Sequence, residues 1–107
     1  MQSTEQKIER AALAGLAAAN MDERERSTDI SLAELAALVE TAGGQPVVTL
    51  LQNKPTPDPR TFLGEGKVAE LRELIAANDC DLAVFDNELS PSQMRVLEEG
   101  LGVRGVD

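Results

Sequence analysis

The chain has 107 residues, close to the commonest size of a single domain, and 42% of them are hydrophobic, which is enough for one core. Its 19 acidic and 10 basic side chains give a formal net charge of -9, which argues against a broad basic face for nucleic acid. The sequence has no histidine and one cysteine, which excludes histidine bases, histidine zinc ligands and an internal disulfide.

The first 29 residues form an N-terminal segment whose structure has two possible interpretations. Residues 8–19 are rich in alanine, which favours a helix, but Gly15 lowers helix propensity and leaves a strand through residues 11–16 as the alternative. Residues 20–29 are charged and have no apolar stripe, which predicts a loop or a disordered segment. The remaining residues, 30–107, are then expected to form an α/β domain.

A first helix is predicted over residues 31–42. Ser31 and Glu34 have the spacing of a capping box, in which each side chain accepts from the backbone N–H of the other residue. Ile30 and Leu35 occupy the positions of a hydrophobic staple around that cap. Two glycines at positions 43 and 44 supply the end of the helix.

Two further helices are predicted over residues 67–77 and 90–100. The helix at 67–77 has its apolar residues on one face, with Leu71 at the centre of the stripe. The helix at 90–100 begins with Ser90 as the cap, Pro91 at the first helical position and Gln93 completing a capping box.

Short apolar runs of strand length, rich in valine, separate these helices. They cover residues 47–51, 82–85 and 103–106. Nearly continuous apolarity is typical of strands buried on both faces of a parallel sheet. The alternation of helices and strands therefore predicts an α/β fold, a small parallel sheet within an α/β/α layer arrangement.

A long connection, residues 53–67, follows the first of these runs. Strand-to-helix connections usually take ~2–6 residues, and three prolines at positions 55, 57 and 59 keep this longer one extended. It holds Lys54, Arg60 and Lys67 against Asp58 and Glu65, a local positive excess in an acidic chain. One interpretation is a stiff loop that contacts a phosphate-bearing partner, and the other is a solvated connection pinned by its prolines.

Gly64, Gly66 and Lys67 suggest an anion site at a helix start, because backbone N–H groups there point outward. Their spacing does not match a Walker A loop, and simple turn geometry explains them equally well. They are retained as candidate cofactor-binding residues.

Three carboxylates, on Asp86, Glu88 and Asp107, follow the predicted strands. In a parallel sheet they would gather at one edge, where α/β proteins usually bind ligands. One interpretation is a magnesium or acyl-phosphate site in a receiver-like or nucleotide-binding module, because magnesium sites use one or two carboxylates plus water. The alternative is that they are ordinary turn and chain-end acids, with no metal bound.

Four strings, in order and at matching distances, resemble the N-terminal domain of the HflX family of ribosome-associated GTPases. They are residues 40–43 (ETAG), 54–71 (KPTPDPRTFLGEGKVAEL), 85–93 (FDNELSPSQ) and 103–107 (VRGVD). The resemblance covers residues 31–107, about three quarters of the chain. It implies a parallel α/β domain, and it favours the strand interpretation near residues 11–16, where the family usually has a strand.

The resemblance also implies a function. In the family this domain precedes a helical hairpin and a GTPase domain, so the chain is expected to be a fragment with no catalytic residues and no cofactor of its own. GTP and magnesium would bind in the GTPase domain, which together with the large ribosomal subunit is the expected partner. The chain would be cytoplasmic, with no membrane span. The candidate partner-contact residues are Lys54, Asp58, Arg60, Phe62, Lys67, Glu88, Ser90 and Gln93.

Overall fold

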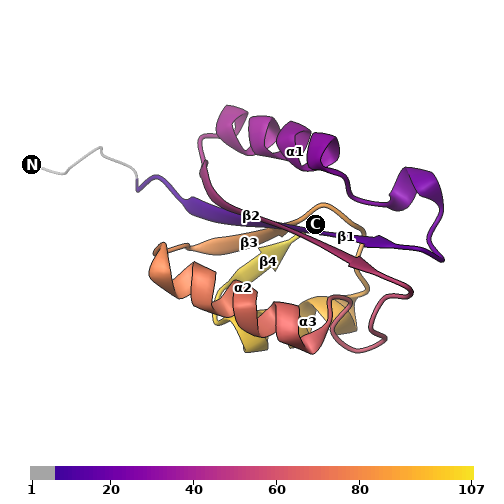
Figure 1. The fold of residues 1–107 in the computed structure, drawn as a ribbon. Coiled ribbons are helices and arrows are strands. Elements are labelled where there is room, and N and C mark those ends of the chain that lie inside the picture. The colour runs from indigo at the N-terminus through magenta and orange to yellow at the C-terminus, as the bar shows by residue number, and fades with distance from the viewer. Residues whose placement is uncertain (1–6) are drawn as a thin grey trace, which may run out of the picture.

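The computed structural model describes residues 7–107, and in that range it has a parallel sheet, three α-helices and one short 3-10 helix (Figure 1). This confirms the predicted α/β class. The elements in chain order are β1 (Arg10–Ala18), η1 (Glu23–Glu25), α1 (Asp29–Thr41), β2 (Gln45–Lys54), α2 (Glu65–Ala77), β3 (Leu82–Phe85), α3 (Pro91–Leu101) and β4 (Arg104–Val106).

The four strands are parallel and lie in the order β2-β1-β3-β4. Residues 8–19 therefore contain a strand and not a helix, and β1 lies at the centre of the sheet. Four of its five alanines are buried, because their small side chains let helices pack closely on both faces. Alanine content, which favours a helix in isolation, is overridden by this burial.

Helices cover both faces of the sheet. α1 lies on one face, and α2 and α3 lie on the other (Figure 1). The core beneath α2 and α3 contains Leu16, Leu50 and Phe85, and the core beneath α1 contains Leu13 and Leu32. No helix among residues 7–107 has both the length and the apolar character needed to cross a bilayer.

The start of α1 differs from the prediction. The helix begins at Asp29 with Thr28 as its N-cap, so Ser31 is the third residue of a Thr28–Ser31 capping box and not the cap itself. The Ser31 N–H donates to Thr28 Oγ1 at 2.9 Å, and the Thr28 N–H donates to Ser31 Oγ at 2.8 Å. Ile30 is 72% exposed, so the predicted staple is wrong as well. Residues 20–29, predicted to be a loop or disordered, hold η1, the Thr28 cap and the first residue of α1.

The other two helices lie close to their predicted ranges. α2 begins two residues early, at Glu65, with Gly64 as its N-cap, and Leu71 and Ile75 are buried. α3 begins as predicted, with Ser90 as the N-cap, proline in the first turn and a capping box to Gln93.

Replacing Ser90 with alanine is expected to lower the free energy of unfolding by about 1 kcal/mol, because the Gln93 N–H loses its acceptor. Chemical denaturation measures the change, with Ser92→Ala, two residues later, as the control. Equal stability of the Ser90 variant and the parent chain would contradict the capping role.

Candidate partner-contact surface at the carboxyl edge of the sheet

All four strands point the same way, so the segments that follow them meet at one edge of the sheet. These segments are residues 19–28 after β1, 55–64 after β2 and 86–90 after β3. The chain leaves β1 toward β2 on one side and later returns to β3 on the other side. In open α/β sheets such a reversal, here between β1 and β3, is where ligands usually bind.

The crevice at this reversal is filled by Asn87. Its side-chain amide extends the sheet, since Oδ1 accepts from the Leu16 N–H at 2.9 Å and Nδ2 donates to the Leu16 carbonyl at 3.1 Å. Nδ2 also donates to the Glu25 carbonyl at 3.0 Å, and Oδ1 accepts from Ser27 Oγ at 3.1 Å. Asn87 therefore joins the end of β1 to the segment before α1 and occupies the space that a ligand would take.

Gly15 makes this arrangement possible. A methyl group on Gly15 would collide with the Ser27 side chain, which lies directly over β1. The Ser27 N–H also donates to the Leu16 carbonyl at 3.0 Å. In the sequence Gly15 indicates only a weaker helix. In the structure its lack of a side chain lets Ser27 approach β1 closely.

The proline loop, residues 55–64, is ordered by Asp58. Its carboxylate accepts from the Arg60 N–H at 2.8 Å and the Thr61 N–H at 2.9 Å. These bonds, the one from Thr61 first, hold the pKa of Asp58 below its ordinary value, so the carboxylate stays ionised at neutral pH. Paired backbone hydrogen bonds between Asp58 and Phe62 close the turn.

Buried residues anchor the second half of the loop. Thr61, Phe62 and Leu63 are all buried, and Thr61 Oγ1 donates to the Leu63 carbonyl at 2.6 Å. Phe62 has a backbone φ of 65°, and its side chain is buried in the core. It therefore anchors the loop and is not part of the exposed surface. The Gly64 N–H donates to Gln52 Oε1 at 2.8 Å and ties the end of the loop to β2.

The structure joins the proline loop to the start of α3. Gln93 Nε2 donates to the Pro59 carbonyl at 3.3 Å, so the strings at 54–67 and 86–93 form one surface. Arg60, Glu88 and Ser90 are exposed on it. Lys54 is half-buried, and Lys67 pairs with Glu70 at 3.3 Å on the first turns of α2.

The candidate anion residues lie at the N-terminus of α2, where Gly64 is the cap and Gly66 and Lys67 follow in the first turn. The Gly64 N–H is already used by Gln52, and the carboxylate of Glu65 lies in the same turn. This cofactor assignment remains a prediction.

The three residues whose carboxylates suggested a magnesium site border one open hollow at the edge of the sheet. Among residues 7–107 no group of three or more acidic, cysteine or histidine side chains is placed to hold a metal ion. Asp86 accepts from Ser31 Oγ at 2.5 Å, and Asp107 accepts from the Leu89 N–H at 2.9 Å. Glu88 is exposed. The two bonded carboxylates fix the start of α1 and the start of α3, and the receiver-like alternative remains a prediction.

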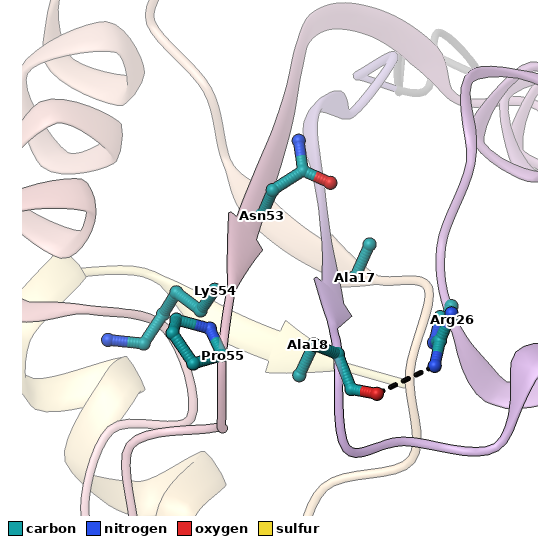
Figure 2. Close-up of a pocket in the computed structure, with 7 residues that line it drawn as sticks. Ala17, Ala18, Arg26, Asn53, Lys54 and Pro55 are labelled. Carbon is teal, nitrogen blue, oxygen red and sulfur yellow. Dashed lines mark hydrogen bonds between the residues drawn. The ribbon is translucent and has the colours of Figure 1, made fainter.

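An open hollow of about 490 Å³ lies at the ends of β1 and β2 (Figure 2). Arg26 lies over the end of β1, where its guanidinium donates to the carbonyls of Ala19 at 2.7 Å and Met21 at 3.0 Å. Asn53 borders the hollow from β2, and Lys54 points away from Arg26 (Figure 2). Sequence reasoning gave no role to Arg26, which shares the segment between β1 and the Thr28 cap with Arg24.

Together these features define a four-stranded parallel α/β domain whose carboxyl edge is closed by Asn87 and carries one rigid, partly basic loop. Residues 29–107 match the family described as GTP-binding GTPase N-terminal. The chain belongs to this family and is an HflX GTPase N-terminal domain.

Several curated relatives carry the name GTPase HflX. The protein of Alkalihalophilus pseudofirmus is 42% identical over 77 residues, which is 72% of this chain and 18% of the relative. The Flavobacterium psychrophilum protein is 33% identical over 100 residues, 94% of this chain and 24% of the relative. The Escherichia coli protein is 36% identical over 76 residues, which is 71% of this chain and 18% of the relative. The chain thus spans about a fifth of the length of these relatives.

Proposed function

We propose that this chain is the docking and regulatory domain at the N-terminal end of a longer GTP-binding protein that associates with the large ribosomal subunit in the cytoplasm. GTP and magnesium would bind in a separate GTPase domain, and this domain would perform no catalysis. The proposal rests on the family membership and on the surface formed by the proline loop and α3.

The main support is the rigid presentation of Arg60. The Asp58 carboxylate fixes the turn that contains Arg60, and the buried Phe62 and Leu63 fix the residues that follow. Because the loop backbone is already ordered, it loses little conformational entropy when a partner binds Arg60. Arg60 is the exposed cation at the tip, and guanidinium groups suit phosphate oxygens.

The net charge of -9 limits the size of any contact with RNA. The acidic remainder of the surface would be repelled by phosphate, so we expect the proline loop to make a small, oriented contact. Most of the affinity for RNA would then come from other parts of the full-length protein. The acidic surface is available to basic ribosomal proteins or to the GTPase domain.

The test reverses the charge of Arg60 in the full-length polypeptide. Arg60→Glu is expected to weaken binding to purified large ribosomal subunits by about tenfold, because an attractive contact becomes repulsive. Co-sedimentation over a range of salt concentrations measures the affinity. The matched control is Arg72→Glu, an equal change on the exposed side of α2.

An equal loss of affinity for both variants would reduce the effect to net charge and contradict a specific contact at the loop. Unchanged binding of the Arg60 variant would show that the loop is a solvated connection.

A further inference from the structure

β2 is an outer strand of the sheet, and its backbone is free along one edge. Only β1 pairs with it, and the Lys54 carbonyl turns toward β1, where it accepts from the Ala19 N–H at 2.8 Å. Alternate residues of a paired strand turn their backbone groups to opposite sides, so Thr49, Leu51 and Asn53 turn theirs outward. In the described part of the chain, none of these three residues has a backbone partner on that side.

The middle of this edge lacks the usual protection against pairing with another chain. Proteins commonly guard outer strands with charged side chains, prolines or bulges. In β2 these features lie at the two ends, with Pro46 and a shift of register at one end and Lys54 at the other. Residues 41–57 contain no acidic residue, the longest such run in a chain that has 19 of them. The edge is therefore open to a partner strand, and no acidic side chain lies along it.

The three outward-facing residues are complementary to a second copy of themselves. In an antiparallel pair with a two-fold axis at Leu51, this leucine faces its own counterpart and Thr49 faces Asn53 of the second copy. Residues paired in this way exchange two backbone hydrogen bonds per pair. The side chains also match, because leucine meets leucine and two hydrogen-bonding side chains meet each other.

The flank of α1 above this edge carries small side chains. Ser31 donates to Asp86, which follows β3, so the other flank, with Ala33, Ala36 and Ala37, lies toward the free edge of β2 (Figure 1). α1 packs on β1 and β2 alike, so its axis lies about 5 Å from the proposed two-fold axis. The two copies of α1 would then be about 10 Å apart, a distance at which helices pack.

The start of α1 lies level with the proposed axis. The Leu32 side chain lies over Gly15, and Gly15 is in register with Leu51. Ala33 follows Leu32 and is therefore the residue of this flank that lies nearest the axis. A small residue at that point lets the two helices approach while the strands pair.

α2 brings no net charge to the same edge on the other face of the sheet. Val68 of α2 lies beside Gly100 of α3, so Lys67 and Glu70 lie on the opposite flank, toward the free edge. The two side chains pair with each other at 3.3 Å. Neither helix therefore opposes the approach of a second copy by an unpaired charge near the axis.

We propose that two copies of this chain pair through the free edges of β2, antiparallel about a two-fold axis at Leu51, and join their sheets into one. The two-fold pairing uses each edge once, so the assembly closes as a dimer. An isolated peptide strand would gain the backbone hydrogen bonds but not the contact between the two α1 helices. Each copy has a net charge of -9, so salt is expected to strengthen the association by screening their repulsion.

The first test is sedimentation equilibrium of this chain and of two variants at position 49. Thr49→Pro removes an outward N–H that β1 does not use and places a ring on the edge. It is expected to raise the dissociation constant of the dimer at least ~10-fold. Thr49→Val keeps the N–H and is the matched control. Circular dichroism shows whether both variants remain folded.

The second test measures disulfide cross-linking and does not need the proline variant. Cys80→Ala first removes the native thiol. Leu51→Cys then faces its counterpart across the axis, whereas Thr49→Cys lies about 13 Å from its own counterpart. Under mild oxidation Leu51→Cys is expected to form covalent dimers at least ~10-fold faster than Thr49→Cys.

Three results would overturn the proposal. The first is a monomer at every concentration up to ~1 mM, at low and at high salt. The second is equal dimerisation of folded Thr49→Pro and Thr49→Val, because the contact would then lie elsewhere. The third is equal cross-linking of the two cysteine variants, which would contradict the axis at Leu51.

Discussion

Replacing Asn87 with alanine is expected to lower the free energy of unfolding by about 3–5 kcal/mol. The side chain is buried and makes hydrogen bonds to the Leu16 N–H, the Leu16 carbonyl, the Glu25 carbonyl and Ser27 Oγ. Alanine leaves a small cavity between β1 and β3 and removes partners from groups that are held away from water. Denaturation in urea, followed by circular dichroism, measures the change.

Asn53→Ala is the matched control. Asn53 is exposed at the end of β2, so the same change of side chain is expected to alter stability by no more than about 0.5 kcal/mol. A loss of stability in the Asn87 variant no larger than in this control would show that water replaces the amide at little cost. The closed reversal between β1 and β3 would then be open to ligands.

Replacing Leu71 with alanine is expected to lower the free energy of unfolding by about 2–5 kcal/mol. Leu71 is fully buried at the centre of α2, where it packs in the core beneath the sheet. Truncation removes apolar contacts and leaves a cavity that the aliphatic neighbours fill only in part. Chemical denaturation measures the difference from the parent chain.

Glu73→Ala on the exposed side of the same helix is the control and is expected to be nearly neutral. Equal, small effects of the two substitutions would contradict the orientation of α2 on the sheet.

Local signals in the sequence were enough to predict much of the fold. The start of α3 is predicted by a local motif of a cap, a proline and a capping-box partner at Ser90, Pro91 and Gln93. The helix begins where this motif indicates. The runs at 47–51 and 82–85 are apolar enough to be read as buried strands, and both lie within strands of the sheet.

Features that depend on distant contacts could not be read in the same way. Ser31 has the sequence of a cap, but Thr28 takes that role, in a segment where Ser27 packs over β1 and Ser31 bonds to Asp86. Lys54, Arg60 and Lys67, in the connection at residues 53–67, could be selected by charge. The buried Phe62 has a backbone φ of 65°, which the sequence around it does not predict.

Asn87 was missed for the same reason. Its partners at Leu16 and Glu25 are far away in the sequence, and an asparagine after a strand usually signals only a turn.

The central position of β1 has a consequence for how the chain folds during synthesis. β1 is made first, yet its partner in β2 is 35 residues away, at Gln45, and its contact with Asn87 spans 71 residues. The alanine-rich strand therefore stays unpaired until β2 has been made, and its other edge stays open until β3 follows. Closing such long loops is slow, and an exposed apolar strand is prone to aggregate while it waits. Nascent chains stalled before Phe85 are therefore expected to be sensitive to proteases and dependent on chaperones.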